Sequence, residues 1–248
     1  MKIKELARVF WQSLFLQANW NYEAMQNIGF LTSLLPQLPQ LTKDKEEQKQ
    51  ILKRHLQYFN TQPYFASVII GSTLAQEHDR INSGLPQAED IIRAKQNMMG
   101  PFAALGDSLF WGTLKPFTGM VAVFLILINK ILWAPLVFLF LYNVPHLFLR
   151  LHGLRMGYRK RLGVVQTVFK YRCQTLIKTI KMMGLIFLGG SLPVFSSQID
   201  GVFSPYADFY LQLLSFTVLT LGLAFLLRRG FSPQWLLLGL LLICFFMF

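Results

Sequence analysis

From Lys115 onward the sequence consists of long apolar runs separated by short basic or polar gaps. An α-helix needs about 20 residues to cross about 30 Å of hydrocarbon. Five runs approach that length, at residues 109–128, 131–149, 182–198, 206–227 and 234–248. The last of them is short for a full crossing. The pattern predicts an all-α, multi-pass membrane protein with about five transmembrane helices.

The first part of the chain has a different composition. Over all 248 residues 53% are hydrophobic, yet residues 1–97 hold nine of the twelve acidic side chains. The sequence therefore predicts two regions, an amphipathic and partly re-entrant region at 1–108 and a transmembrane helical region at 109–248. The N-terminus mixes charges among its apolar residues, so we expect no cleaved secretory signal.

The charge of the gaps predicts the orientation. Between Arg150 and Lys181 there are nine basic residues and no acidic one, and Lys and Arg near span ends favour the cytoplasm. We therefore expect this gap, and by counting back residues 1–108, on the cytoplasmic side. The net charge of +12 is explained by topology and anionic lipid, and no nucleic-acid partner is predicted.

The segment after the N-terminus has the period of an amphipathic helix. One broad apolar face is formed by Ala7, Phe10, Trp11, Leu14, Phe15, Ala18, Tyr22 and Met25. Gln17 and Asn21 fall on or beside that face, where an amide without a partner costs about 1–3 kcal/mol. Two interpretations are open: a helix lying on the membrane surface, or a helix whose amides face a polar cavity shared with another subunit.

A second amphipathic helix is expected after Thr42, its predicted N-cap, with a packed stripe of Ile51, Leu52, Leu56 and Phe59. The stretch NTQPYFASVIIGSTLAQ (60–76) follows. Its apolar run is too short to span a bilayer, and it predicts a re-entrant hairpin segment.

Signals of enzyme chemistry are absent from the sequence. There is no phosphate-binding glycine loop ending in Lys-Ser or Lys-Thr and no G-x-S-x-G elbow. The pair His78-Asp79 lacks a second His/Asp pair at metal-ligand spacing, which favours a solvated surface. The sequence predicts no catalytic residue, no metal site and no cofactor.

The stretch MMGPFAALGDSLFWGTLKPF (98–117) carries three glycines, two prolines and one acid, Asp107, among apolar residues. A charge at membrane depth costs roughly 2.5–3.5 kcal/mol. We expect the chain to break at Gly100-Pro101 and Gly106 and to form a polar site at Asp107. The alternative is that Asp107 caps a helix beginning at Ser108, and both could hold together.

Four stretches closely resemble one family in the same order and at similar spacing: QANWNYEAMQNIGF (17–30), RHLQYFNTQPYFASVIIG (54–71), MGPFAALGDSLFWGTLKP (99–116) and LYNVPHLFLRLHGLRMGY (141–158). They are similar to the IID subunit of mannose/fructose/sorbose phosphotransferase systems. The resemblance covers essentially the whole chain, and its GDSLFWGT core is very specific.

The resemblance implies half of a sugar permease in the bacterial cytoplasmic (inner) membrane. Members pair with a IIC membrane subunit, and the IIC–IID heterodimers form a trimer that moves the sugar by an elevator-like motion. Cytoplasmic IIA and IIB proteins carry the phosphoryl group, so a IID subunit is not catalytic by itself. This favours subunit contact for the N-terminal amphipathic helix. The alternative function is a non-transporting membrane scaffold that stabilises a partner.

Sugar contacts are expected from polar residues held in apolar context, because amides and carboxylates hydrogen-bond a neutral polyol. Trp20 or Trp111 would pack against its C–H face. The predicted substrate-binding residues are Asn19, Asn21, Glu23, Gln26, Asn27, Asn60, Thr61, Gln62, Asp107 and Ser108. The plainer role for each is to fix the hairpins and the IIC interface.

Overall fold

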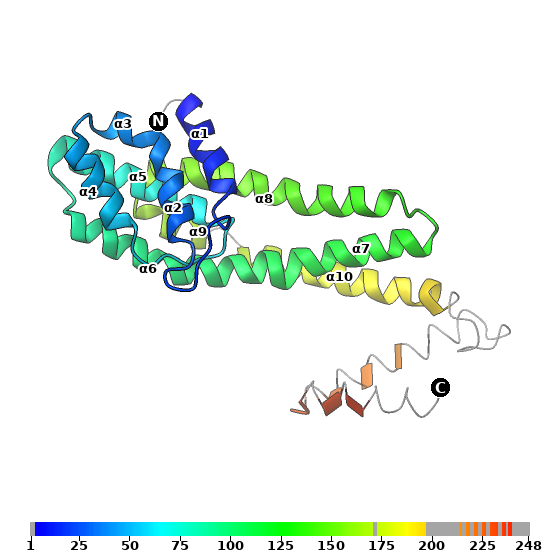
Figure 1. Ribbon diagram of the computed structural model, residues 1–248. Helices are drawn as coiled ribbons and strands as arrows, with labels where there is room; N and C mark the ends of the chain where they lie inside the picture. Colours follow the sequence, from blue (N-terminus) through cyan, green and yellow to red (C-terminus); the bar gives the residue numbers. More distant parts are fainter. Residues whose placement is uncertain are drawn as a thin grey trace. The chain divides into compact units, whose positions relative to one another are not determined.

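The computed structural model describes residues 3–170, residues 173–196 and short pieces between residues 214 and 239. The elements in chain order (Figure 1) are α1 Ile3–Leu14, α2 Asn27–Leu34, the 3-10 helix η1 Leu35–Gln37, α3 Leu38–Leu41, α4 Lys45–His55, α5 Ala66–Ser83, α6 Ala88–Gly106, the π-helix η2 Asp107–Leu114, α7 Lys115–Leu127, α8 Trp133–Lys160, α9 Gly163–Lys170 and α10 Cys173–Ser196. The described part of the chain is all-helical, and the predicted fold class is confirmed.

The chain forms two compact units. The first comprises Met1–Gly119 and Leu136–Lys181, and the second comprises Met120–Pro135 and Met182–Phe248. The expected division after residue 108, between an amphipathic and a transmembrane region, stays a prediction.

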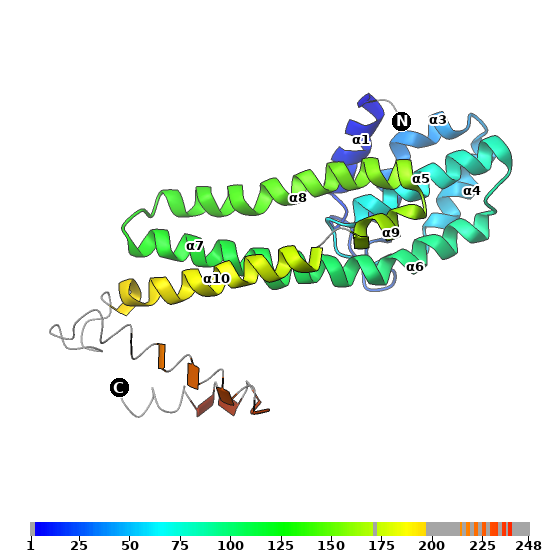
Figure 2. The ribbon, with the colours of Figure 1, turned by 180° about the vertical axis from the view of Figure 1, so that it is seen from behind.

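Helix α5 is the centre of the first unit. Every residue from Ala66 to Glu77 is buried, because α2, α6 and α8 each pack against it. Figure 1 shows α2 and α4 in front of α5, and Figure 2 shows α8 and α9 on its other side. The predicted re-entrant segment is thus one regular helix that forms a helical hairpin with α6. Its depth in a bilayer stays a prediction.

The crossing of α5 and α8 is unusually close. A Cβ on Gly71 would lie 2.2 Å from the carbonyl oxygen of Leu154, and one on Gly157 would lie 2.1 Å from that of Val68. Gly153, four residues before Gly157, faces the same stretch of α5. This spacing of small residues is the one that lets two membrane helices bring their backbones together.

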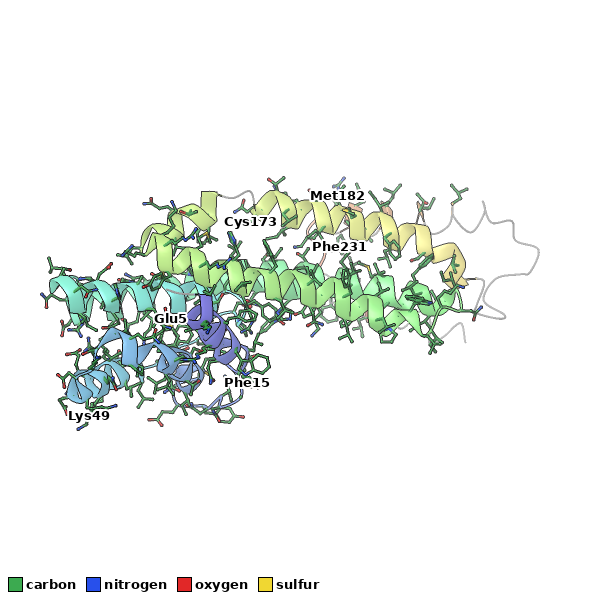
Figure 3. The ribbon with its side chains drawn as sticks, turned by 90° about the horizontal axis from the view of Figure 1, so that it is seen from above. Glu5, Phe15, Lys49, Cys173, Met182 and Phe231 are labelled. Atoms are coloured by element: carbon green, nitrogen blue, oxygen red, sulfur yellow. The ribbon has the colours of Figure 1, made fainter. Side chains whose placement is uncertain are left out.

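Helix α1 packs against the rest of the chain through residues outside the predicted apolar face. Leu6, Val9 and Ser13 point into the core, whereas Trp11 is 59% and Phe15 49% exposed. Figure 3 shows Phe15 projecting outward beyond the end of α1. A second, narrower stripe packs against α2, and whether a membrane or another subunit covers the predicted face stays a prediction. The helix also ends at Leu14, earlier than expected.

Helix α4 has its N-cap two residues later than predicted, at Asp44 and not at Thr42. Asp44, in extended conformation, accepts a hydrogen bond from the Glu46 amide at 3.0 Å. Thr42 instead accepts one from the Asp44 amide at 3.1 Å, so it precedes the N-cap. The predicted stripe is only partly right, because Leu56 lies past the helix and is 48% exposed.

Two helical stretches of the described residues are long and apolar enough to cross a membrane. They are Ala88–Leu127, which joins α6, η2 and α7, and Trp133–Lys160, which is α8. The predicted runs at 109–128 and 131–149 coincide largely with them. The run at 182–198 overlaps α10 as far as Ser196. The runs at 206–227 and 234–248 lie mostly outside the described residues.

In the second unit a tight turn joins α7 to α8. Asn129 adopts a left-handed φ of 58°, and the Lys130 amide donates to the carbonyl of Leu125 at 2.8 Å. Phe124 of α7 packs edge-on against Phe187 of α10, with ring centroids 5.1 Å apart. The described residues of this unit therefore bring the ends of three helices together.

Candidate functional site

Hydrogen bonds join the loop before α2 to the loop before α5. The side chain of Gln26 donates to the carbonyl of Thr61 at 2.9 Å and accepts from its amide at 3.2 Å. Asn27 donates to the Leu56 carbonyl at 2.7 Å, and Asn21 donates to Asn27 at 2.9 Å. These four predicted sugar ligands satisfy one another or the backbone. Their polar atoms hydrogen-bond within the protein and hold the two loops together. This is the structural role predicted as the alternative to sugar contact.

The second loop continues along α6. The Thr61 hydroxyl donates to the carbonyl of Met99 at 3.0 Å, and the side chain of Gln62 lies against Gly106, where a Cβ would come within 2.6 Å of it. Gln62 Oε1 accepts from the amides of Tyr64 and Phe65 at 2.8 and 3.2 Å, in the turn that precedes α5. Gln62 Nε2 is buried without a hydrogen-bond partner.

Asp107 follows Gly106 directly. The expected chain break does not occur, because Pro101 is accommodated inside α6 and the backbone stays helical from Ala88 to Leu127. The capping interpretation of Asp107 is also wrong, since its φ of −62° and ψ of −43° are helical. Gly106 serves close packing against Gln62, and the helix widens into the π-helix η2 instead of breaking.

The π-helix presents the carboxylate in a half-buried position. Among the described residues the carboxylate of Asp107 has no hydrogen-bond or ion-pair partner, and Trp111, four residues on, is 50% exposed. Ser108 is also half-buried, and its carbonyl accepts from the Thr113 hydroxyl at 2.7 Å across five residues. Segments of π-helix occur often at functional sites.

Three predicted residues lie at the surface. The side chains of Asn19, Glu23 and Asn60 are exposed, and the backbone amide of Asn60 approaches the Met99 sulfur at 3.3 Å. Gln62 lies against Gly106, the residue before Asp107. In the described part of the chain, no contact links Asn19 or Glu23 to Asp107.

A polar and aromatic cluster next to this region is missing from the sequence prediction. The hydroxyls of Tyr64 and Tyr142 are 3.0 Å apart, and the His146 ring stacks on Tyr64 with centroids 4.4 Å apart. Arg150 lies over the Tyr64 ring at 5.2 Å and donates to the Ser13 carbonyl. Arg150 is 5% exposed, so α1, α5 and α8 meet at a buried guanidinium.

The sequence spacing of the α8 members of this cluster indicates that they share one face of the helix. Tyr142, His146 and Arg150 follow one another at four-residue steps, so they form one polar stripe along an apolar helix. Periodicity of polar residues within a predicted span marks such a stripe. In the sequence Arg150 also begins the basic gap, and His146 has no partner at metal-ligand spacing.

A buried ionic cluster lies between α4 and α5. His55 Nε2 donates to Glu77 Oε1 at 2.8 Å, and Arg80 and Arg54 approach Glu77 Oε2 at 3.1 and 3.4 Å. Burial lowers the pKa of His55 and outweighs its bond to Glu77. Burial alone would raise the pKa of Glu77, but the hydrogen bond from His55 and the neighbouring arginines bring it below its usual value. The pair is therefore a neutral imidazole donating to a carboxylate.

The described residues contain no group of three or more His, Cys, Asp or Glu side chains placed to hold a metal ion. The polar groups left open next to η2 are a carboxylate and an amide. Together they can accept from and donate to the hydroxyls of a neutral ligand, with the indole of Trp111 available to its apolar face.

Comparison with known proteins identifies the family. A family described as the PTS system mannose/fructose/sorbose family IID component matches residues 1–248. The mannose-specific EIID component of Escherichia coli K12 is 31% identical over 96% of this chain and 90% of its own length. The sorbose-specific EIID component of Klebsiella pneumoniae is 32% identical over 95% and 92%. The fructose permease IID component of Bacillus subtilis 168 is 29% identical over 97% and 93%.

Solved structures give the same result. The cryo-electron microscopy structure of the mannose transporter ManYZ in complex with microcin E492 contains a chain that is 29% identical, with a TM-score of 0.62 and coverage of 99% of this chain and 95% of that one. A second structure, described as a membrane protein, has a TM-score of 0.72 at 28% identity, covering 98% and 95%. The chain belongs to the IID component family of the mannose/fructose/sorbose phosphotransferase systems and is a membrane permease subunit of such a system.

Proposed function

We propose that this subunit forms, with a IIC membrane subunit, the path that translocates a hexose or related sugar, coupled to its phosphorylation by cytoplasmic IIA and IIB proteins. The proposal includes a trimer of IIC–IID heterodimers and several crossings of the inner membrane. The subunit has no catalytic role of its own. Its support is the family and the resemblance to the ManYZ mannose transporter.

The observation that carries the sugar-binding part is the pair of open polar groups beside η2. The carboxylate of Asp107 has no partner among the described residues, and Gln62 Nε2 is buried without one. Gln62 packs on Gly106, which directly precedes Asp107. A buried amide hydrogen that finds no acceptor costs about 1–3 kcal/mol, and a sugar hydroxyl would supply that acceptor while donating to the carboxylate.

The other predicted contacts take secondary places in the proposal. Asn19, Glu23, Asn60 and Ser108 keep side chains free to reach a ligand. Asn21, Gln26, Asn27 and Thr61 act through the loops that they fix. Trp111 supplies the apolar face that a pyranose or furanose ring requires.

The first test is phosphoenolpyruvate-dependent phosphorylation of a panel of labelled sugars by membrane vesicles, with this chain present or deleted and the neighbouring subunits supplied. Phosphate appearing on one sugar only in the presence of the chain is the expected result, and it also names the substrate. No difference on any sugar, with the chain inserted and the other subunits competent, would favour the non-transporting scaffold.

Asp107→Asn tests the site itself. We expect sugar phosphorylation at limiting sugar to fall at least about tenfold, because loss of a charged hydrogen-bond acceptor costs about 1.5–3 kcal/mol, while the membrane complex still assembles. Asp90→Asn is the matched control, because Asp90 is exposed in the first turn of α6, and it should leave activity unchanged. Loss of assembly in Asp107→Asn would make Asp107 structural.

A further inference from the structure

The exposed face of α8 changes character along the helix. Its apolar part includes Val144, Phe148 and Leu151, which are 48%, 68% and 37% exposed. Arg155 and Arg159 continue the same face at four-residue steps from Leu151, and both are exposed. Where the residues on one exposed helix face change from apolar to basic, the helix passes from the hydrocarbon of a bilayer to the headgroups.

The position of that boundary agrees with the thickness of a bilayer. Trp133, at the start of α8, is 61% exposed, and exposed Trp is typical of a membrane interface. From Trp133 to Arg155 the helix rises about 33 Å, against about 30 Å of hydrocarbon. Arg155 is therefore placed at the level of the lipid headgroups on the opposite side from Trp133.

The exposed residues of α10 also change along the helix, from basic near its start to apolar further on. Met182 and Leu185 are 58% and 64% exposed, and Lys178 and Lys181 precede them on the exposed surface. Figure 3 marks Cys173 and Met182, which bracket the two lysines in the chain. Leu154, Val164 and Ile177 belong to one hydrophobic cluster, so the end of α8, α9 and the start of α10 pack together in the first unit.

The basic side chains of this face are not neutralised by the protein. In the described residues, no hydrogen bond or ion pair engages Arg155, Arg159, Lys160, Lys178 or Lys181. Arg161 is different, because it forms an ion pair with Asp79, with Nη2 2.7 Å from Oδ1. The sequence from 150 to 181 supplies no acid that could pair with the others.

Apolar side chains are interspersed with these charges. Leu162, Phe169 and Leu176 are 53%, 49% and 51% exposed, on or beside a helix whose Val164 and Val168 are buried. Basic residues mixed with exposed large apolar ones are typical of segments that lie in the interface of a bilayer. An acidic soluble protein would match the charge but not these apolar side chains.

We propose that Arg155, Arg159, Lys160, Lys178 and Lys181 form a binding surface for the headgroups of anionic phospholipids, with the exposed apolar side chains of Leu162, Phe169 and Leu176 beside them in the membrane interface. This function is independent of the sugar and of the phosphoryl transfer. It requires only that α8 and α10 lie in a bilayer.

The test measures lipid selectivity at the protein surface. The full chain with its partner membrane subunit is reconstituted in phosphatidylcholine vesicles containing a trace of spin-labelled phosphatidylglycerol or spin-labelled phosphatidylcholine. We expect phosphatidylglycerol to be immobilised at least about threefold more, since each basic side chain can contribute up to about fivefold. The preference should vanish in about 1 M salt, where the Debye length is about 3 Å.

The decisive variant is the triple substitution Arg155→Gln, Lys178→Gln and Lys181→Gln. It should abolish most of the preference. The matched control replaces Lys43, Lys45 and Lys53 with Gln; these three are exposed around and along α4, the helix on which Figure 3 labels Lys49, and the preference should remain.

Equal immobilisation of the two lipids by the unmodified protein would overturn the proposal, and this arm needs no variant. A preference that persists in high salt, or that the control substitutions remove as completely as the triple substitution does, would also overturn it. Phosphorylation activity is not the readout, so a wrong sugar assignment would leave this test intact.

Discussion

Gly157 illustrates how single residues set the distance between helices. A Cβ on Gly157 would lie 2.1 Å from the backbone oxygen of Val68, which cannot move without shifting α5. We expect Gly157→Ala to lower the free energy of unfolding by about 1–3 kcal/mol, the usual cost of overpacking. Thermal unfolding of the purified protein followed by intrinsic fluorescence measures it.

Gly100→Ala is the matched control for that substitution. Gly100 also lies inside a helix, but nothing lies within 4 Å of a Cβ added there, so Ala should be neutral or stabilising by up to about 1 kcal/mol. If both substitutions had the same effect, helix propensity rather than the α5–α8 contact would explain the result.

Glu77 is a second residue whose substitution should change the free energy of unfolding. Its side chain is 1% exposed, and its carboxylate contacts His55, Arg54 and Arg80. Glu77→Gln removes the buried carboxylate of this cluster and leaves Arg54 and Arg80 only the more exposed Glu47. We expect it to lower the free energy of unfolding by about 3 kcal/mol at neutral pH. Glu46→Gln, at a surface pair with 63% of the carboxylate side chain exposed, should stay within about 0.5 kcal/mol.

The same pair predicts the pH dependence of stability. The pKa values of His55 and Glu77 are both lowered from 6.5 and 4.5 by folding, so the unfolded chain binds more protons as the pH falls through this range. Stability is fully present above about pH 6.5 and decreases on acidification. Unfolding temperatures between pH 8 and 4 should show this decrease, and Glu77→Gln should flatten its lower part. A stability that rises on acidification would contradict the assignment of a neutral His55.

At the scale of elements, α1 carries two apolar faces with different roles. Val9 is fully buried against the unit, and Val9→Ala should cost about 1–3 kcal/mol of unfolding free energy. Trp11 is 59% exposed and stacks edge-on with Phe15 at 5.7 Å. Trp11→Ala should leave unfolding nearly unchanged but weaken association with the membrane or the partner subunit. Co-purification of that subunit and unfolding in detergent separate the two effects.

Periodicity alone does not show which face of α1 packs inside the chain. Helical spacing identified an amphipathic segment, but Ala7, Trp11 and Phe15 form as regular a stripe as Leu6, Val9 and Ser13. Only the position of α2 decided which stripe is buried. The π-helix η2 is a similar case: the glycines and proline near Asp107 predicted a break, and packing of Gln62 on Gly106 kept the helix continuous.

At the scale of the whole molecule, exposed apolar side chains are abundant on the membrane helices. Leu132, Phe140 and Ile186 are 81%, 66% and 72% exposed, and lipid or a partner subunit must cover such surfaces. We expect the protein to unfold at a higher temperature when purified with its IIC partner than alone, because a partner that binds only the folded state stabilises it. Identical unfolding temperatures would indicate that lipid covers these surfaces.

The sequence by itself determined the family, the helical class and the presence of apolar membrane helices. These features depend on local properties of the sequence, namely the length of its apolar runs and the order of four stretches that resemble the family. It also identified Asp107 and Gln62 as polar residues in apolar surroundings. The choice between sugar contact and structural role could not follow from residue type, because Gln26 and Asn27 look like Gln62 and Asp107 in the sequence.

Only the tertiary structure separated these residues. Gln26, Asn27 and Thr61 are 29 to 35 residues from their hydrogen-bond partners, and Arg150 is 137 residues from Ser13. Long-range pairing decides whether a polar atom is satisfied internally or left open to a ligand, and a sequence does not show which distant backbone group will come near. The local sequence therefore determined the helices and the family. Packing between residues far apart in the sequence determined which polar groups are hydrogen-bonded internally and which can bind a ligand.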